Sequence, residues 1–258
     1  MRGKWLSAGI ILAGISVHPF AGNLRADSQD AKKDKSAQDK TSPAEKEAAL
    51  VAQLQPALKN KKWVDAETLL VQLIALQPKN WEYEKAYADT EFNLEKLTEA
   101  LDAYDKAIVL AQRITYDPSK PDSARAKAAQ SEMFSAKGVI FLRQKKNDEA
   151  ISSYALAAEL SPEPASGYLN LCIVQYDVGT LDAALAACEK AQKADPAKAD
   201  VYFMKGAALY AMGKYDDNNK FVVPAGTEEA LKKYLELAPK GAHADDAKQM
   251  LAKIAGSS

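Results

Sequence analysis

The chain has 258 residues, of which 47% are apolar, so it can bury a substantial core in one large or two small domains. Its formal net charge is −1, and residues 1–26 contain three basic residues and no acidic one, so the remainder carries −4. A weakly acidic surface of mixed charge lacks the electrostatic signature of a protein that binds nucleic acid or anionic membranes.

Residues 1–26 have the organisation of a secretory signal peptide. Arg2 and Lys4 precede an apolar run over residues 5–17, and Pro19 and small residues follow it. The run is too short for a membrane-spanning helix, which needs about 20 residues. We therefore expect an exported protein, periplasmic or secreted, with no stable membrane insertion after removal of the signal. An uncleaved N-terminal anchor is the alternative.

Residues 27–41 are rich in Ser, Gln, Lys and Asp. No Leu, Ile, Val, Met or aromatic residue occurs over residues 25–49. A segment of this composition cannot bury enough apolar surface to offset the conformational entropy lost on ordering. We predict a disordered polar tether over 27–41 and a folded domain over 42–255.

Two helix pairs are predicted over about residues 47–80 and 81–114. Equivalent positions recur at a spacing of 34 residues: Ala66 with Ala100, Leu70 with Tyr104, and Leu73 with Ala107. Ser42 and Glu45 can form a capping box at the start of the first helix, with a Pro between them in the first turn. Pro56 lies inside this helix and is expected to kink or split it.

An insertion of sixteen residues separates the second pair from the third, because Ala100 and Ala150 are 50 residues apart instead of 34. It contains a turn over residues 116–121, which its Pro and Asp content indicates. Asp122 or Ser123 can then cap a long helix that runs to about residue 145. Eight extra residues lengthen such a helix by about 12 Å.

The most regular pairs cover residues 131–164 and 165–198. In both, an aromatic residue, a small residue, two further small residues and a Pro fall at matching positions: Phe134, Gly138, Ala150, Ala157 and Pro162, and then Tyr168, Cys172, Ala184, Ala191 and Pro196. Small residues are needed where two helices approach closely, and Pro ends the second helix of each pair. This pattern resembles the tetratricopeptide repeat (TPR).

A fifth pair, about residues 199–241, keeps Tyr202 and Gly206 in its first helix and is interrupted by a predicted loop over 216–226. A last helix over 244–254 has one apolar face and is expected to cap the array. The resemblance therefore implies an all-α fold, a right-handed α-solenoid of about five TPR-like helix pairs plus a C-terminal capping helix.

In TPR proteins the first helix of each pair lines a concave groove, so the resemblance implies a peptide-binding groove here. The corresponding positions are Lys85, Asp89, Phe92, Asn93, Val139, Leu142, Arg143, Leu169, Asn170, Ile173, Tyr176, Asp177, Phe203, Met204 and Tyr210. Their apolar members suit an extended or helical peptide, unless the stack curls tightly enough for them to contact each other or the tether. Asp89 stands where TPR domains that clamp a terminal carboxylate have Asn, which argues against that subtype.

Cys172 and Cys188 are the only cysteines. They fall on facing positions of one helix pair, within reach of a disulfide, and export to an oxidising compartment favours the bond. The alternative is that both are buried free thiols. Two thiols and one His outside the signal, His243, do not provide a metal site.

The sequence contains no arrangement typical of nucleophilic catalysis and no phosphate-binding loop. We therefore expect a protein that is not an enzyme and needs no cofactor, an exported scaffold or adaptor that binds a protein or peptide partner in cell-envelope assembly or secretion. Two alternatives stay open: a ligand-binding or enzyme-accessory protein with a cavity capped by the 216–226 loop, and a self-assembling structural protein. The apolar triplet Phe221, Val222 and Val223 can contact a partner or pack on the solenoid.

Overall fold

The computed structural model describes residues 42–117 and 119–256, which form eleven helices and one small β-hairpin. These residues make two compact units that meet in the sequence between Lys127 and Ala128, and each unit has its own hydrophobic core. The predicted signal peptide and tether, residues 1–26 and 27–41, lie outside the described residues. Within the described part of the chain, every helix is too short or too polar to cross a lipid bilayer.

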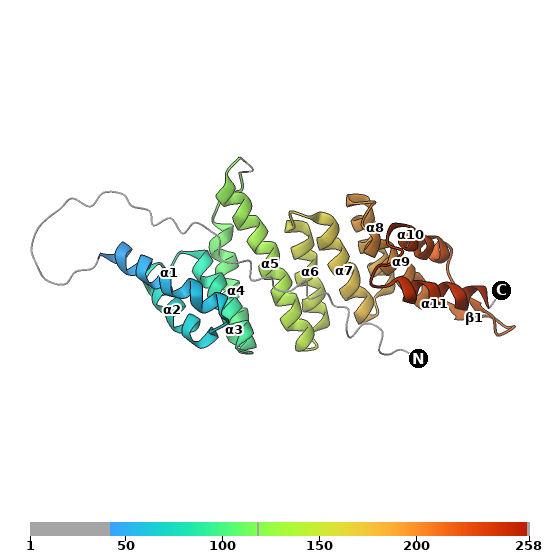
Figure 1. The fold of residues 1–258 in the computed structure, drawn as a ribbon, viewed down its shortest axis with the longest axis horizontal. Coiled ribbons are helices and arrows are strands. Elements are labelled where there is room, and N and C mark those ends of the chain that lie inside the picture. The colour runs from blue at the N-terminus through green and yellow to red at the C-terminus, as the bar shows by residue number, and fades with distance from the viewer. Residues whose placement is uncertain (1–41, 118, 257–258) are drawn as a thin grey trace, which may run out of the picture. The chain divides into compact units, whose positions relative to one another are not determined.

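The first unit, which precedes Ala128, is built on helices that each pack on the next along the chain (Figure 1). They are α1 (Pro43–Lys59), α2 (Trp63–Leu76), α3 (Trp81–Asn93) and α4 (Leu97–Gln112). Leu54, Leu70 and Tyr83 are fully buried in its core. The Tyr83 hydroxyl donates a hydrogen bond to Glu47 (2.6 Å), which ties α3 to α1.

The predicted capping box starts α1. Ser42 Oγ accepts a hydrogen bond from the backbone N–H of Glu45 (3.2 Å), and the Glu45 carboxylate accepts one from the N–H of Ser42 (2.8 Å). The predicted split at Pro56 does not occur, because α1 continues to Lys59 as one helix. Pro56 lies in the last turn, where its missing N–H removes one hydrogen bond, and its own carbonyl still accepts one from Asn60 (3.0 Å).

The insertion between the second and third pairs produces a long helix, as predicted. α4 ends at Gln112, and the next two N–H groups close a tighter turn by donating to the carbonyls of Leu110 (3.2 Å) and Ala111 (3.1 Å). After a short loop, α5 (Pro121–Arg143) runs for 23 residues, compared with 13 for α3. This helix begins in the first unit and continues into the second.

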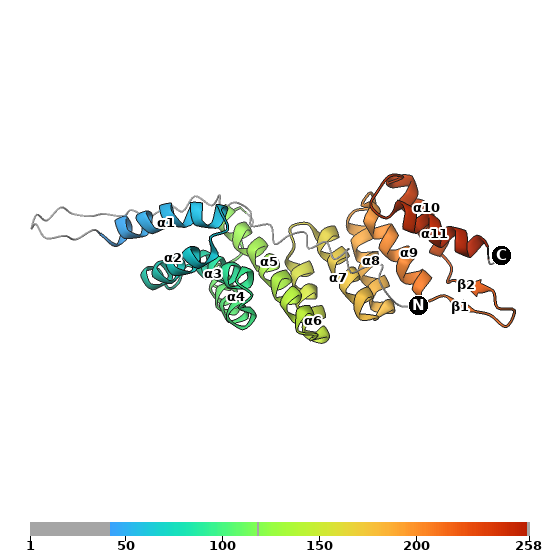
Figure 2. The same cartoon turned by 60° about the horizontal axis from the view of Figure 1, so that its bottom comes forward.

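The second unit, from Ala128 onward, continues with six helices that pack in succession (Figure 2). They are α6 (Asn147–Leu160), α7 (Pro164–Val178), α8 (Leu181–Ala194), α9 (Ala199–Ala211), α10 (Thr227–Leu237) and α11 (Ala244–Ala255). In addition, α7 packs on α9, so the first helices of successive pairs lie next to each other. Such contacts between neighbouring pairs are the basis of a stacked repeat array.

Small residues mark the points of closest helix approach. A Cβ atom added to Gly138 would lie 2.6 Å from the ring of Tyr154, and one added to Gly206 would lie 2.7 Å from the side chain of Leu231. Both distances are too short for any larger residue without rearrangement. The predicted need for small residues at these two positions is confirmed.

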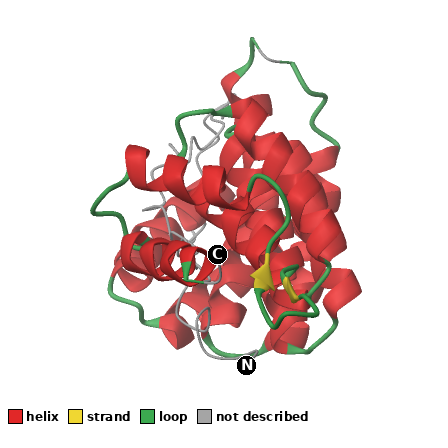
Figure 3. Cartoon of the chain, turned by 90° about the vertical axis from the view of Figure 1, so that its right-hand side faces the viewer, coloured by secondary structure: helices red, strands yellow, loops and turns green. Residues whose placement is uncertain are grey.

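A short antiparallel hairpin, whose strands are drawn in yellow in Figure 3, begins just before the predicted 216–226 loop and takes up its first half. Its strands are β1 (Lys214–Tyr215) and β2 (Phe221–Val222). Asp216 closes the turn, since its Oδ1 accepts hydrogen bonds from the N–H groups of Asn218 and Lys220, both at 2.9 Å. Two-residue strands are too short to leave a recognisable alternation in the sequence.

Candidate functional site

The predicted groove residues of the second unit differ in exposure. Leu169, Ile173, Phe203 and Met204 have 3–8% of their surface exposed and belong to the hydrophobic core of this unit. Their side chains therefore pack between helices and offer little surface to a partner. These four positions are therefore part of the core of the second unit.

Phe203 shows what covers these positions. Its ring stacks on that of His243, with centroids 4.2 Å apart and planes inclined by 6°, and it also contacts Tyr234 at 5.4 Å. The backbone N–H of His243 donates to the Tyr234 hydroxyl (2.8 Å). Phe203 thus joins α9 to α10 and to the start of α11, which is a structural role.

Seven predicted residues of the second unit keep accessible surface, and we call them the candidate groove. Val139, Leu142, Asn170, Tyr176 and Tyr210 are half-buried, and Arg143 and Asp177 are exposed. They come from α5, α7 and α9. The apolar members pack against the core cluster and keep part of their surface accessible, so the candidate groove combines supported apolar surface with polar and charged groups.

Tyr176 and Asp177 lie in the last turn of α7. The surrounding protein reduces their hydration, which raises the pKa of Asp177 to about 6 and also raises the pKa of Tyr176, with a further contribution from the Asp177 charge. The Asp177 side chain nevertheless remains exposed to solvent.

The other four predicted residues lie on α3 of the first unit. Lys85 Nζ pairs with Asp89 at 3.0 Å, and Asp89 also accepts a hydrogen bond from the Tyr104 hydroxyl (2.6 Å). Asn93 donates to the backbone carbonyl of Asp89 (2.7 Å), and Phe92 is buried. The charge of Lys85 is compensated locally, which agrees with the sequence argument against a carboxylate clamp.

The hairpin packs on the end of α9 and on α11. The ring centroid of Phe221 lies 5.1 Å from that of Tyr210 and 5.3 Å from that of Tyr215, and Lys253 Nζ lies 5.0 Å from the Phe221 centroid. A hydrogen bond with Tyr215 raises the pKa of Lys253. Of the apolar triplet, Phe221 therefore packs on the helices, whereas Val222 has 48% of its surface exposed.

Cys172 of α7 and Cys188 of α8 are joined by a disulfide, with their Cα atoms 5.3 Å apart, and both are fully buried. The bond connects the two helices of one pair. Over residues 42–117 and 119–256, no three His, Cys, Asp or Glu side chains come together in a way that could hold a metal ion.

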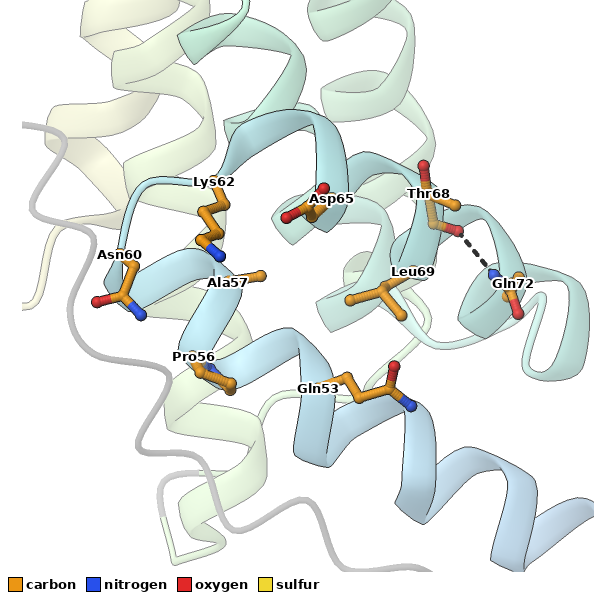
Figure 4. A pocket seen from close by; sticks show the side chains of 9 residues that line it. All are labelled: Gln53, Pro56, Ala57, Asn60, Lys62, Asp65, Thr68, Leu69 and Gln72. Carbon is orange, nitrogen blue, oxygen red and sulfur yellow. Dashed lines mark hydrogen bonds between the residues drawn. The ribbon is translucent and has the colours of Figure 1, made fainter.

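Two hollows lie away from the candidate groove. One, of about 490 Å³, lies between α1 and α2 and is mostly polar, with Leu69 and Ala57 among its few apolar groups (Figure 4). The other, of about 910 Å³, lies beside α10 and is lined in part by Val223–Gly226. This second hollow is partly open to solvent, and residues of the predicted 216–226 loop form part of its wall.

A buried acid on α3 was not predicted. Glu91 has 1% of its surface exposed, and its Oε2 lies 3.5 Å from Lys96 Nζ, which also donates to Glu67 at 2.6 Å. Burial, and then the Glu67 charge, raise the pKa of Glu91. The equivalent position of the third pair is Phe141, so only an alignment of the repeats could have drawn attention to this acid.

Helix pairs that cross at small residues and expose a mixed apolar and polar inner face define a helical-repeat protein. Two family models, each described as tetratricopeptide repeat, match residues 52–118 and 169–218 in one case and 131–164 in the other, together more than half of the chain. The chain belongs to the tetratricopeptide repeat family. Proteins of this fold typically mediate protein–protein interactions.

Solved structures share the fold at low sequence identity. A tetratricopeptide repeat protein from Parabacteroides merdae ATCC 43184 is 14% identical, with 82% of this chain and 76% of that chain covered and a TM-score of 0.59. YrrB, described as a TPR protein with an unusual peptide-binding site, is 18% identical, with coverages of 78% and 90% and a TM-score of 0.54. MamA from Desulfovibrio magneticus RS-1 is 18% identical, with coverages of 76% and 97% and a TM-score of 0.54. No curated protein sequence matches this chain.

Proposed function

We propose that this chain is an exported, non-catalytic scaffold that binds a peptide segment of a partner protein in the candidate groove. The observation that carries the proposal is that Val139, Leu142 and Tyr176 pack against the core cluster and still keep part of their surface accessible. Apolar and aromatic side chains in such positions are typical anchors of a protein interface.

The rigidity of these side chains supports binding. Because the core already restricts them, a bound peptide would immobilise little additional side-chain freedom, and that freedom is a main cost of association. The disulfide between Cys172 and Cys188 fixes α7, which carries Tyr176, against α8. YrrB, a protein of the same fold, is described as having a peptide-binding site, which is consistent with the proposal.

The non-catalytic part of the proposal rests on the usual role of this family in protein–protein interaction. The location rests on residues 1–26, whose basic start and short apolar run are typical of a secretory signal peptide. We therefore place the scaffold in cell-envelope assembly or secretion. Fractionation of a bacterial host that expresses the full chain, with mass spectrometry of the mature N-terminus, tests this location. Recovery of uncleaved protein in the cytoplasmic fraction would contradict it.

Binding in the candidate groove is tested by affinity capture from envelope extract with the full chain. Tyr176→Ala and Leu142→Glu should each lose the captured partner, since they remove or charge the apolar surface. Leu156→Glu is the matched control, because Leu156 is an apolar residue of α6 outside the candidate groove with 43% of its surface exposed. Retention of the same partner by both groove variants would refute the proposal.

A further inference from the structure

We propose that Asp177 determines the specificity of the candidate groove, which takes a peptide carrying a Lys or Arg side chain that pairs with the Asp177 carboxylate beside the ring of Tyr176. This inference rests on the proposed function and goes beyond it by naming the chemistry of the partner. It follows from where Asp177 lies in α7, from what surrounds it, and from the contacts that it lacks.

The position of Asp177 is unfavourable for an acid. It lies in the last turn of α7, and a helix C-terminus carries partial negative charge that is stabilised by cations and destabilised by carboxylates. α7 has no basic residue in its last turn. The left-handed Gly179 closes the helix by donating its N–H to the carbonyls of Gln175 and Tyr176. A cation bound here would be attracted both by Asp177 and by the helix end.

No neighbour compensates this charge. Among the described residues, none forms an ion pair or a hydrogen bond with the Asp177 carboxylate. Arg143 occupies the equivalent position on α5, yet the pKa of Asp177 is shifted by burial alone and is not lowered by any base. The Asp177 carboxylate is thus partly desolvated, has no positively charged partner among the described residues, and is accessible to a ligand.

The fold gains nothing from such a group, and Asn would fit the same place without a charge. Residues that lower stability and serve no internal contact are typical of functional surfaces, where charge is retained for a ligand. The sign of the charge selects a cation. A metal ion does not fit, because no second or third ligand accompanies Asp177 in the described part of the chain.

A basic side chain of a peptide fits the remaining requirements. The ring of Tyr176 precedes Asp177 in the same turn and is half-buried, so it offers apolar surface to the methylene stem of Lys or Arg and an aromatic face to its charged end. Asn170, about two helical turns earlier on α7, is half-buried and can bond to the peptide backbone.

The test uses a phage library of random peptides, selected separately on the full-length wild-type protein and on Asp177→Asn, Asp177→Lys and Glu189→Gln. Glu189→Gln is the matched control, since it removes an exposed negative charge from the neighbouring helix α8. We expect Lys or Arg at one fixed position in peptides selected by the wild type and by the control, and Asp or Glu there in peptides selected by Asp177→Lys.

A selected peptide and its Lys→norleucine counterpart then complete a double-mutant cycle. The wild type should bind the Lys peptide roughly fivefold more tightly than the norleucine peptide, as is typical of a partly exposed ion pair, and Asp177→Asn should bind the two equally. Thermal unfolding of each variant confirms that it is folded.

The outcomes separate this inference from the proposed function. Peptides that need Tyr176 for binding but carry no common basic residue, or a Lys preference that persists in Asp177→Asn, would overturn the role of Asp177 and leave the groove intact. If no peptide is selected, or if binding survives Tyr176→Ala, the groove itself is refuted and this inference with it.

Discussion

The bond between Cys172 and Cys188 should supply a large part of the stability of the second unit. Replacing both residues by Ala removes a cross-link between positions separated by 16 residues. The loop-closure entropy that such a link takes from the unfolded chain corresponds to about 3 kcal/mol. Both sulfurs are fully buried, so the two truncations should add about 1 kcal/mol from lost packing. For a unit of this size the sum lowers Tm by roughly 10 °C.

Thermal unfolding followed by circular dichroism, on wild type and on the double Ala variant, measures this effect. Adding a reducing agent provides the control, since it should bring the wild type toward the variant and leave the variant unchanged. Two titratable thiols per wild-type chain in denaturant without reductant would show that the bond is absent. A double variant that melts within about 2 °C of the wild type would show that the entropic reasoning fails.

Three further predictions concern stability. Gly138→Ala should lower the free energy of unfolding in urea by about 1–2 kcal/mol, because the new Cβ would lie 2.6 Å from the Tyr154 ring. This loss should occur even though Ala has a better helix propensity than Gly. In a Tyr154→Leu background the same substitution should cost less. Asp177→Asn should stabilise the protein at pH 7.5, because it removes a carboxylate whose charged form the folded protein disfavours. The gain should be at most about 1 kcal/mol, since solvent screens the charge of an exposed side chain. The folded chain binds the Asp177 proton more tightly than the unfolded chain does. The stabilisation by Asn should therefore shrink as pH falls through about 6 and vanish below 3.8, the ordinary pKa of an Asp side chain. A stabilisation that does not depend on pH would contradict this reasoning. Ser42→Ala should cost about 1 kcal/mol and fray the start of α1, which amide hydrogen exchange at residues 44–46 would detect. Unchanged exchange there would mean that the cap is not formed in solution.

The helix-pair architecture was predictable because it depends on local chemistry that recurs at a fixed spacing. Gly138 and Gly206 meet large side chains of the second helix of their own pair, so a small residue is required wherever that crossing recurs. The capping box at Ser42 is also local, and the four residues 42–45 are enough to predict it. Of the two outcomes expected at Pro56, a kink or a split of the helix, the split does not occur, because Pro56 lies in the last turn of α1, where little helix follows it.

The candidate groove was predictable only in part. Repeat position indicates which face of a first helix points inward, but it does not indicate how closely neighbouring pairs approach. Phe203, for example, is buried because Tyr234 and His243, about 30 and 40 residues later, pack against its ring. Such coverage depends on contacts between distant segments, for which a single sequence has no signal.

The β1–β2 hairpin and Glu91 illustrate the same limit. Phe221 and Lys253 are far apart in the chain and form one cluster only when α11 lies beside α9. Glu91 occupies a core position that an aromatic residue, Phe141, fills in the third pair. The charge nearest to it is that of Lys96, at the start of α4, which also pairs with Glu67 of α2. Neither could be inferred from spacing.

The hairpin has a consequence for how this protein could diversify. It emerges between the two helices of one pair, and its side chains are held by a few aromatic contacts and by Lys253, while the helices on either side keep the ordinary crossing at Gly206. The segment over residues 214–224 could therefore be shortened, exchanged or grafted onto another member of the family without dismantling the scaffold. It is the natural place for a laboratory, or for evolution, to retarget the molecule.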